Sequence, residues 1–166
     1  MPQKAESNKV FTVVGQNKNR PAVLVINGPN LNLLGEREPD VYGRQTLEEI
    51  NNDLQKYAHS RGVSIDFFQS NHEGELVDQV QQSRGKYEAL IVNAGALSHY
   101  SIALLDALKM TDVPIIEVHL SNIYRREDFR HQSLVSTVAI GGIFGLGARG
   151  YFLALEAAIQ IIAEGK

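Results

Sequence analysis

The chain has 166 residues, of which 43% are hydrophobic and 21% charged, and its formal net charge is -3 at pH 7. These values are typical of one globular domain, and the negative net charge disfavours nucleic acid or an anionic membrane as a partner. Cysteine is absent, which excludes disulfide bonds and thiolate chemistry, and no apolar run approaches the roughly 20 residues of a membrane helix, so we expect a cytoplasmic protein.

The chain divides into a polar extension and a regular domain. Residues 1–20 are polar apart from the run VFTVV, so we expect an N-terminal extension that is flexible or adds one short strand. Residues 21–166 are expected to form one domain. Within it, five apolar runs predict strands at 22–26, 63–69, 89–93, 114–120 and 136–144.

Helical signals follow the predicted strands. Thr46 and Glu49 are spaced as a capping box, which predicts the start of a helix. An apolar stripe from Leu47 to Tyr57 predicts that this helix continues and ends near Gly62. The other helical segments are expected at 75–84, at 101–110, as a turn in the charged segment 124–130, and in a long apolar stretch that runs to about residue 164.

Strands that alternate with helices indicate a parallel sheet covered on both faces. Five such units in about 145 residues fit an α/β fold of the flavodoxin-like, doubly wound kind, with a five-stranded parallel sheet in the order 2-1-3-4-5. Ligands bind beyond the carboxyl ends of the strands in such sheets. The motifs NGPN, NAGALSH and EVHLSN leave the first, third and fourth strands, which are neighbours in this order, so we expect them to converge on one crevice.

Each motif also has a structural explanation. Glu117 and His119 lie two residues apart on one face of a strand, where a carboxylate can orient an imidazole and favour its protonated form, although a purely structural pair remains possible. His99 could be a residue of a helix start. Arg126 and Arg130, four residues apart in a predicted helical turn, fit either a solvated face or an anion clamp.

The segment from Asn27 to Arg44 is several times longer than the usual connection of about 2 to 6 residues between a strand and a helix. It contains Tyr42, and Arg37 lies in the same loop. A guanidinium near a phenol favours the phenolate and so lowers its pKa towards the range of a general base. A tyrosine base, a histidine acid and arginines for a carboxylate together describe proton abstraction beside a carbonyl.

Other motif interpretations are weaker. The run GLGARG at 145–150 matches a dinucleotide-binding pattern, but the chain ends too soon for the second strand with its acidic residue, so these glycines are expected to permit turning and tight packing. No histidine spacing typical of a metal site and no G-x-S-x-G nucleophile motif is present, so we expect neither a metal site nor this kind of hydrolase.

Five long motifs in the same order resemble the type II 3-dehydroquinate dehydratases: VLVINGPNLNLLGEREPDVYG, QSNHEGELVD, IVNAGALSHYSIALLDAL, IIEVHLSNIYRREDFRHQS and GLGARGYFLAL. The resemblance runs from about Ala22 to about Ala163, and the first 20 residues fall outside it. It implies an enzyme that removes water from 3-dehydroquinate in the shikimate pathway, giving 3-dehydroshikimate by anti elimination through an enolate, without cofactor or metal.

The resemblance also implies the catalytic roles. Tyr42 would remove the C2 proton, with Arg37 keeping the phenol ionised. His119, oriented by Glu117, would protonate the departing C1 hydroxyl, and Asn30 would help to stabilise the enolate by holding a water molecule. The loop that carries Arg37 and Tyr42 would act as a mobile lid.

Substrate binding and assembly follow from the same resemblance. The binding residues would be Asn93, His99, the amide of Leu120, Ser121, Arg126 and Arg130. Asp106 lies seven residues after His99, which would place both on one helical face. In this family it would reach the site of a neighbouring subunit, in a homododecamer built as four trimers.

Two alternatives remain open at this stage. A flavodoxin-like module that binds a small anion or a nucleotide without catalysis would explain the polar strand ends, but it leaves Tyr42, Glu117 and His119 without a function. A Schiff-base mechanism would need a lysine, and all seven lysines lie outside the strand-end motifs.

Overall fold

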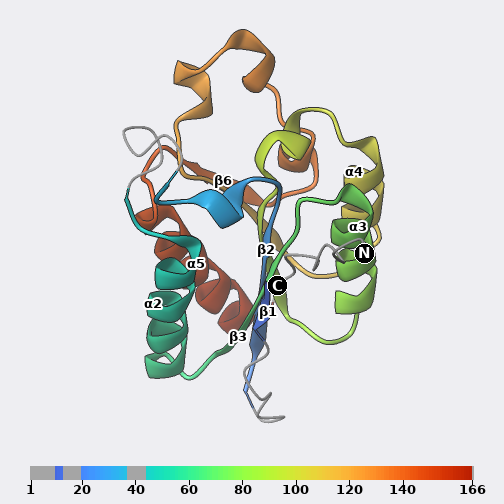
Figure 1. Cartoon of the computed structure of the whole chain (residues 1–166). Helices are drawn as coiled ribbons and strands as arrows, with labels where there is room; N and C mark the ends of the chain where they lie inside the picture. The colour runs from blue at the N-terminus through green and yellow to red at the C-terminus, as the bar shows by residue number, and fades with distance from the viewer. Residues whose placement is uncertain (1–9, 13–19, 37–43, 166) are drawn as a thin grey trace, which may run out of the picture.

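The computed structural model describes residues 10–12, 20–36 and 44–165, which form one sheet with helices on both faces (Figure 1). The sheet has the order β1-β3-β2-β4-β5-β6. Its strands are β1 (Val10–Thr12), β2 (Ala22–Asn27), β3 (Ser64–Gln69), β4 (Ala89–Asn93), β5 (Ile115–His119) and β6 (Gly141–Phe144). The strands β2 to β6 pair in parallel, and their order β3-β2-β4-β5-β6 confirms the predicted 2-1-3-4-5 arrangement.

Two helical layers cover the sheet. The helices α2 (Leu47–Ser60) and α5 (Arg149–Glu164) lie on one face, and α3 (Glu73–Ser83) and α4 (Ile102–Lys109) lie on the other (Figure 1). The central strands β2 and β4 are buried along their whole length, because both faces are covered, which explains their uninterrupted apolar sequences. Each face has its own apolar cluster. None of the described helices has the length and apolar character needed to span a membrane.

The first helix of the domain begins as the sequence predicts. The Thr46 hydroxyl accepts a hydrogen bond from the Glu49 amide, and the Glu49 carboxylate accepts one from the Thr46 amide, so the capping box is complete. Leu47, Ile50 and Leu54 are buried on one side of this helix. The capping box therefore sets where the chain re-enters regular structure after the long loop.

Part of the N-terminal extension joins the sheet as β1. This strand pairs antiparallel with β3, with Val10 opposite Gln69 and Thr12 opposite Phe67. As a result β3 is not an edge strand, and β1 occupies the backbone groups that an edge would present.

The connection from β5 to β6 differs from the prediction. Segment 124–130 is not an α-helix: the connection contains three short 3₁₀ helices, η3 (Ile123–Arg125), η4 (Asp128–Arg130) and η5 (Val135–Thr137), and β6 is shorter than the predicted strand. Side chains that bond to nearby backbone explain this, because they compete with regular structure. The Asn122 side chain accepts from the Tyr124 amide, and the Thr137 hydroxyl donates to the Leu134 carbonyl.

Candidate active site

A pocket opens beyond the carboxyl ends of β2, β4 and β5, where the strand order predicts a ligand site. The connection after β5, orange in Figure 1, rises above these strand ends and forms one wall. Eight of the predicted site residues line the pocket: Asn30, Asn93, His99, His119, Leu120, Ser121, Arg126 and Arg130. The three motifs therefore converge as expected. Among the described residues, no group of three or more His, Asp or Glu side chains is arranged to hold a metal ion.

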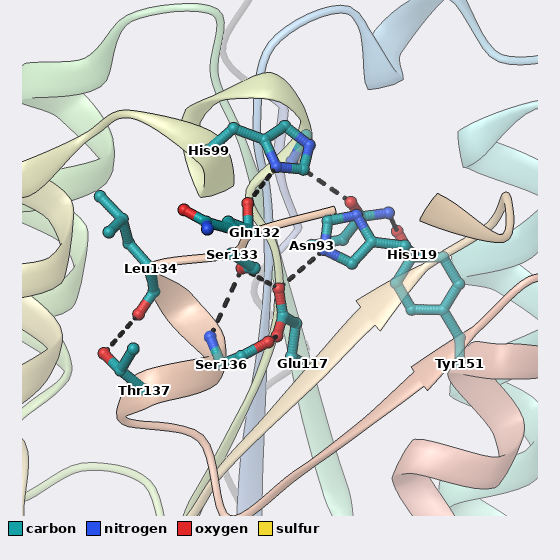
Figure 2. A network of polar contacts seen from close by, with 11 residues as sticks. Asn93, His99, Glu117, His119, Gln132, Ser133, Leu134, Ser136, Thr137 and Tyr151 are labelled. Atoms are coloured by element: carbon teal, nitrogen blue, oxygen red, sulfur yellow. Dashed lines mark hydrogen bonds and ion pairs between the residues drawn. The ribbon is translucent and has the colours of Figure 1, made fainter. Parts of the chain in front are cut away.

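His119 and Glu117 lie at the end of β5 and point to the same side of the sheet. His119 Nε2 lies 2.7 Å from Glu117 Oε1, and the carboxylate also accepts hydrogen bonds from the hydroxyls of Ser133 and Ser136 (Figure 2). Burial raises the pKa of the fully buried Glu117 carboxyl, but these three donors outweigh burial and leave the pKa below its usual value. The carboxylate is therefore held in its ionised form beside the imidazole.

His99 faces His119 across the pocket, with the two rings stacked and their centroids 6.0 Å apart. Its Nδ1 lies 2.7 Å from the carbonyl oxygen of Gln132 (Figure 2). A carbonyl can only accept, so Nδ1 carries the proton and Nε2 of a neutral ring is an acceptor. Burial lowers the pKa of His99, and the nearby His119 and Arg130 lower it further against the opposing effect of the Gln132 contact. The ring is therefore suited to accept a hydrogen bond from a substrate hydroxyl.

The amide of Asn93 is oriented from below by Tyr151 of α5. Asn93 Nδ2 donates to the Tyr151 hydroxyl at 2.8 Å, and that hydroxyl donates to Asn27 Oδ1 at 2.5 Å (Figure 2 includes Asn93 and Tyr151). Burial raises the pKa of Tyr151, so the phenol stays protonated and can serve as donor. The amide of Gly95 donates to Asn93 Oδ1 at 3.3 Å. The side-chain nitrogen and oxygen of Asn93 thus each have a hydrogen-bond partner, which fixes the orientation of the amide.

Arg126 and Arg130 share one carboxylate. Glu127 Oε2 lies 2.9 Å from Arg130 Nε and 3.5 Å from Arg126 Nε. The guanidinium of Arg130 also lies over the ring of Phe129, 5.1 Å from its centroid. Arg126 lies at an extended position after η3, and Arg130 ends η4, so the two do not share an α-helical face as the sequence suggested. They nonetheless line the same wall of the pocket.

The NGPN turn after β2 is fixed by close backbone packing. A Cβ on Gly28 would lie 2.2 Å from the carbonyl oxygen of Ala94, so only glycine fits there. Asn30 has φ 68°, a left-handed conformation that asparagine tolerates. Its backbone amide donates a hydrogen bond to Asn71 Oδ1 at 2.8 Å. The turn thus holds Asn30 at the pocket.

The second half of the long loop lies outside the described residues, which end at residue 36 and resume at residue 44. Arg37 and Tyr42 belong to this part, so their positions relative to the pocket stay predictions. The flanking residues do meet: a Cβ on Gly35, which has φ 88°, would lie 3.0 Å from the carbonyl oxygen of Arg44.

The expected common helical face of His99 and Asp106 is wrong. His99 ends the 3₁₀ helix η2 (Gly95–His99), the chain turns at Tyr100, and Ser101 then caps α4, whose Ile102 is the first residue. A seven-residue spacing implies one face only within a continuous helix. Asp106 is exposed on α4, lies 3.7 Å from Lys109 Nζ, and does not line the pocket of its own chain.

Sequence reasoning missed four residues that support the site: Asn27, Ser133, Ser136 and Tyr151. Asn27 and Asn93 share a signal, because each is an asparagine that ends an otherwise apolar strand, and they pair in register. Tyr151 reads as a core aromatic of an apolar helix. The two serines follow no period relative to Glu117, and only the fold brings them to it.

Comparisons with known proteins agree with the fold. The family described as dehydroquinase class II matches residues 21–159. A 3-dehydroquinate dehydratase of Francisella philomiragia is 59% identical over 84% of this chain and 95% of its own, and one of Halothermothrix orenii is 53% identical over 86% and 97%. The crystal structure of a type II dehydroquinase from Butyrivibrio crossotus superposes with a TM-score of 0.82, at 40% identity over 84% of this chain and 97% of that chain.

Proposed function

This chain belongs to the class II dehydroquinases, and from that membership we propose that it removes water from 3-dehydroquinate to give 3-dehydroshikimate, as a hydro-lyase of the shikimate pathway. The observation that carries the proposal is the buried His119–Glu117 pair, whose imidazole faces a pocket lined by cationic and amide groups at the strand ends. A non-catalytic anion or nucleotide module is not favoured, because it gives this pair no function.

His119 is the acid in this mechanism. Its Nε2 is engaged by Glu117, so Nδ1 is the nitrogen that serves the substrate. As an imidazolium, the ring donates the Nδ1 proton to the departing C1 hydroxyl, which leaves as water. The Nε2 proton stays on the hydrogen bond to Glu117, and the neutral ring must then be reprotonated before the next turnover.

Tyr42 is the base that removes the C2 proton, and Arg37 favours its ionised form. Support for this pair comes from the sequence, since both residues match the motif of the family. Loss of the C2 proton gives an enolate, and elimination of the C1 hydroxyl from the opposite face completes the anti reaction. Asn30, held at the pocket by its backbone, stabilises the enolate by a hydrogen bond, directly or through a water molecule.

The remaining pocket residues bind the substrate. Ser121 and the amide of Leu120 take the carboxylate, and Asn93 holds the ring. His99 accepts from a hydroxyl through Nε2, which agrees with its protonated Nδ1 on Gln132. Arg126 and Arg130 bind the other oxygen atoms of the substrate, and their shared Glu127 limits how far either side chain can move.

The active assembly is a homododecamer of four trimers in this proposal, located in the cytoplasm. Asp106 reaches the pocket of a neighbouring subunit. Its exposure on α4, away from the pocket of its own chain, supports this assignment.

The decisive experiment is an ultraviolet assay of the purified chain with 3-dehydroquinate, because the conjugated enone product absorbs where the substrate does not. Tyr42→Phe is expected to lower turnover by about 100-fold or more, with KM nearly unchanged, since it removes a general base but keeps the ring. Near-normal turnover of this variant would reject the base assignment. Inactivation by borohydride in the presence of substrate would instead indicate a Schiff base on a lysine.

A further inference from the structure

The carboxylate of Glu117 is held at both oxygen atoms. Oε1 accepts from His119 Nε2 at 2.7 Å and from the Ser133 hydroxyl at 2.5 Å, and Oε2 accepts from the Ser136 hydroxyl (Figure 2). The serines come from the connection after η4, 16 and 19 residues away in sequence. Neither serine is among the residues that line the pocket.

The neighbours of Glu117 in the sheet contribute no charge that could balance its carboxylate. Its neighbours in the sheet are Val92 on β4 and Gly142 on β6, which are uncharged. Among the described residues, His119 on the same strand and His99 on η2 are titratable groups that interact electrostatically with Glu117. The carboxylate itself is fully buried. The hydroxyls of the two serines are therefore the uncharged donors that offset its burial.

We propose that Ser133 and Ser136 are positioning residues for the acid: they fix the Glu117 carboxylate so that it accepts the hydrogen bond from His119 Nε2 and directs Nδ1 to the substrate. The inference rests on the proposed dehydration, and it adds two residues that act only through Glu117. Without them the carboxylate can rotate about its last torsion, and Oε1 no longer has a fixed direction towards Nε2.

A second consequence concerns protonation. A serine hydroxyl that donates to Glu117 stabilises the ionised carboxylate, whereas burial favours the neutral acid. If both hydroxyls are removed, the carboxyl takes up a proton at higher pH. A neutral Glu117 is a poorer acceptor for the hydrogen bond from Nε2. As the pH is lowered, activity should therefore fall at a higher pH than in wild type.

The test compares Ser133→Ala, Ser136→Ala and the double variant with Thr137→Val. Thr137 lies in the same turn as Ser136, but its hydroxyl donates to the Leu134 carbonyl instead of Glu117 (Figure 2). We expect the double variant to lose about 10-fold or more in kcat, the range for lost hydrogen bonds to a charged group, with little change in KM. The acid limb of its pH profile should shift to higher pH. Ser133→Thr, which keeps a hydroxyl, should retain much of the activity that Ser133→Ala loses. Thr137→Val should behave as wild type.

Two further measurements test the role of the serines separately from the proposed dehydration. In a Glu117→Gln background, the serine substitutions should have no additional effect on kcat, since their role passes through the carboxylate. Infrared spectroscopy of the substrate-free protein should detect the protonated carboxyl of Glu117, identified by its absence in Glu117→Gln, at higher pH in the double variant than in wild type.

An unshifted carboxyl titration in the folded double variant would overturn the inference, and so would a serine effect of equal size in the Glu117→Gln background or an equal loss in Thr137→Val. If wild type does not dehydrate 3-dehydroquinate, the proposed function fails. The infrared titration needs no substrate and would still decide whether the serines control Glu117.

Discussion

Tyr151 is buried among the apolar residues of α5, yet its hydroxyl joins the ends of two strands. It accepts from Asn93 and donates to Asn27, so one phenol decides which way the Asn93 amide is turned in the pocket. The pKa of this phenol is raised by burial, which keeps the donor proton in place at any pH of interest. A core residue therefore contributes to how the pocket recognises its ligand.

Tyr151→Phe is expected to lower the free energy of unfolding by about 1–3 kcal/mol, because Asn27 Oδ1 and Asn93 Nδ2 lose a buried partner. KM should rise as well, since the amide can then rotate. Urea unfolding and steady-state kinetics measure both effects. Tyr57→Phe is the matched control: its hydroxyl donates to Glu156 between α2 and α5, far from the pocket, so kcat and KM should not change. Unchanged kinetics in Tyr151→Phe would contradict the role.

The lowered pKa of Glu117 also makes a prediction about stability and pH. A carboxyl whose pKa is lower in the folded than in the unfolded protein stabilises the fold above its unfolded pKa of about 4.3, and this contribution is lost as the pH falls through the folded pKa. The stability advantage of wild type over Glu117→Gln should therefore be largest near neutral pH and shrink below about pH 4. Urea midpoints of both proteins between pH 7 and pH 3 test this. An advantage that grows on acidification would mean the opposite shift.

The residues that could be predicted from sequence are those whose relation is local. Glu117 and His119 share a face because a strand has a period of two, and Asn30 lies directly after a strand. Ser133 and Ser136 could not be found this way, since their link to Glu117 depends on how an irregular connection folds back over β5. The motif resemblance located Arg37 and Tyr42, but their positions lie outside the described residues.

At the level of elements, the NGPN turn shows how tightly one loop is tied to the sheet. Gly28 donates its amide to the Asn93 carbonyl, 2.8 Å away, and packs against the backbone of Ala94. We expect Gly28→Ala to destabilise the fold by about 3 kcal/mol or more, because the clash is with backbone and the ends of β2 and β4 must separate. It should also lower kcat/KM by displacing Asn30.

Gly74→Ala provides the matched control for this prediction. A Cβ on Gly74, in the first turn of α3, would contact nothing within 4 Å, so stability should stay unchanged or rise by up to about 1 kcal/mol. Thermal unfolding of both variants tests the pair. A Gly28→Ala protein as stable as wild type would mean that the turn adapts without strain.

The regular elements could be predicted from the sequence wherever apolar periodicity was strong. The strand order and the capped start of α2 belong to this group. The conformation of the connection after β5 could not be predicted, because it depends on hydrogen bonds between side chains and nearby backbone. Such bonds leave no periodic pattern in the sequence. The same limit explains the error at His99 and Asp106, where one turn at Tyr100 interrupts the helical spacing.

At the scale of the whole molecule, charge is distributed unevenly. The chain carries a net charge of -3, yet the pocket is lined by Arg126, Arg130 and two histidines. No carboxylate of the described residues lines the pocket itself: Glu117 is buried behind His119, and Glu127 pairs with the two arginines. The pocket therefore offers a local attraction for a small anion that the overall charge does not reveal.

The assembly can be tested by combining two inactive variants. If Asp106 acts in a neighbouring pocket, a subunit with His119→Asn still supplies Asp106, and a subunit with Asp106→Ala still supplies His119. Each homogeneous protein should have low activity. Co-expressed and purified as mixed oligomers with two different affinity tags, they should regain activity, because some pockets then contain both residues. If Asp106 serves its own pocket, every pocket lacks one residue, and mixing should give no more than the average of the two variants.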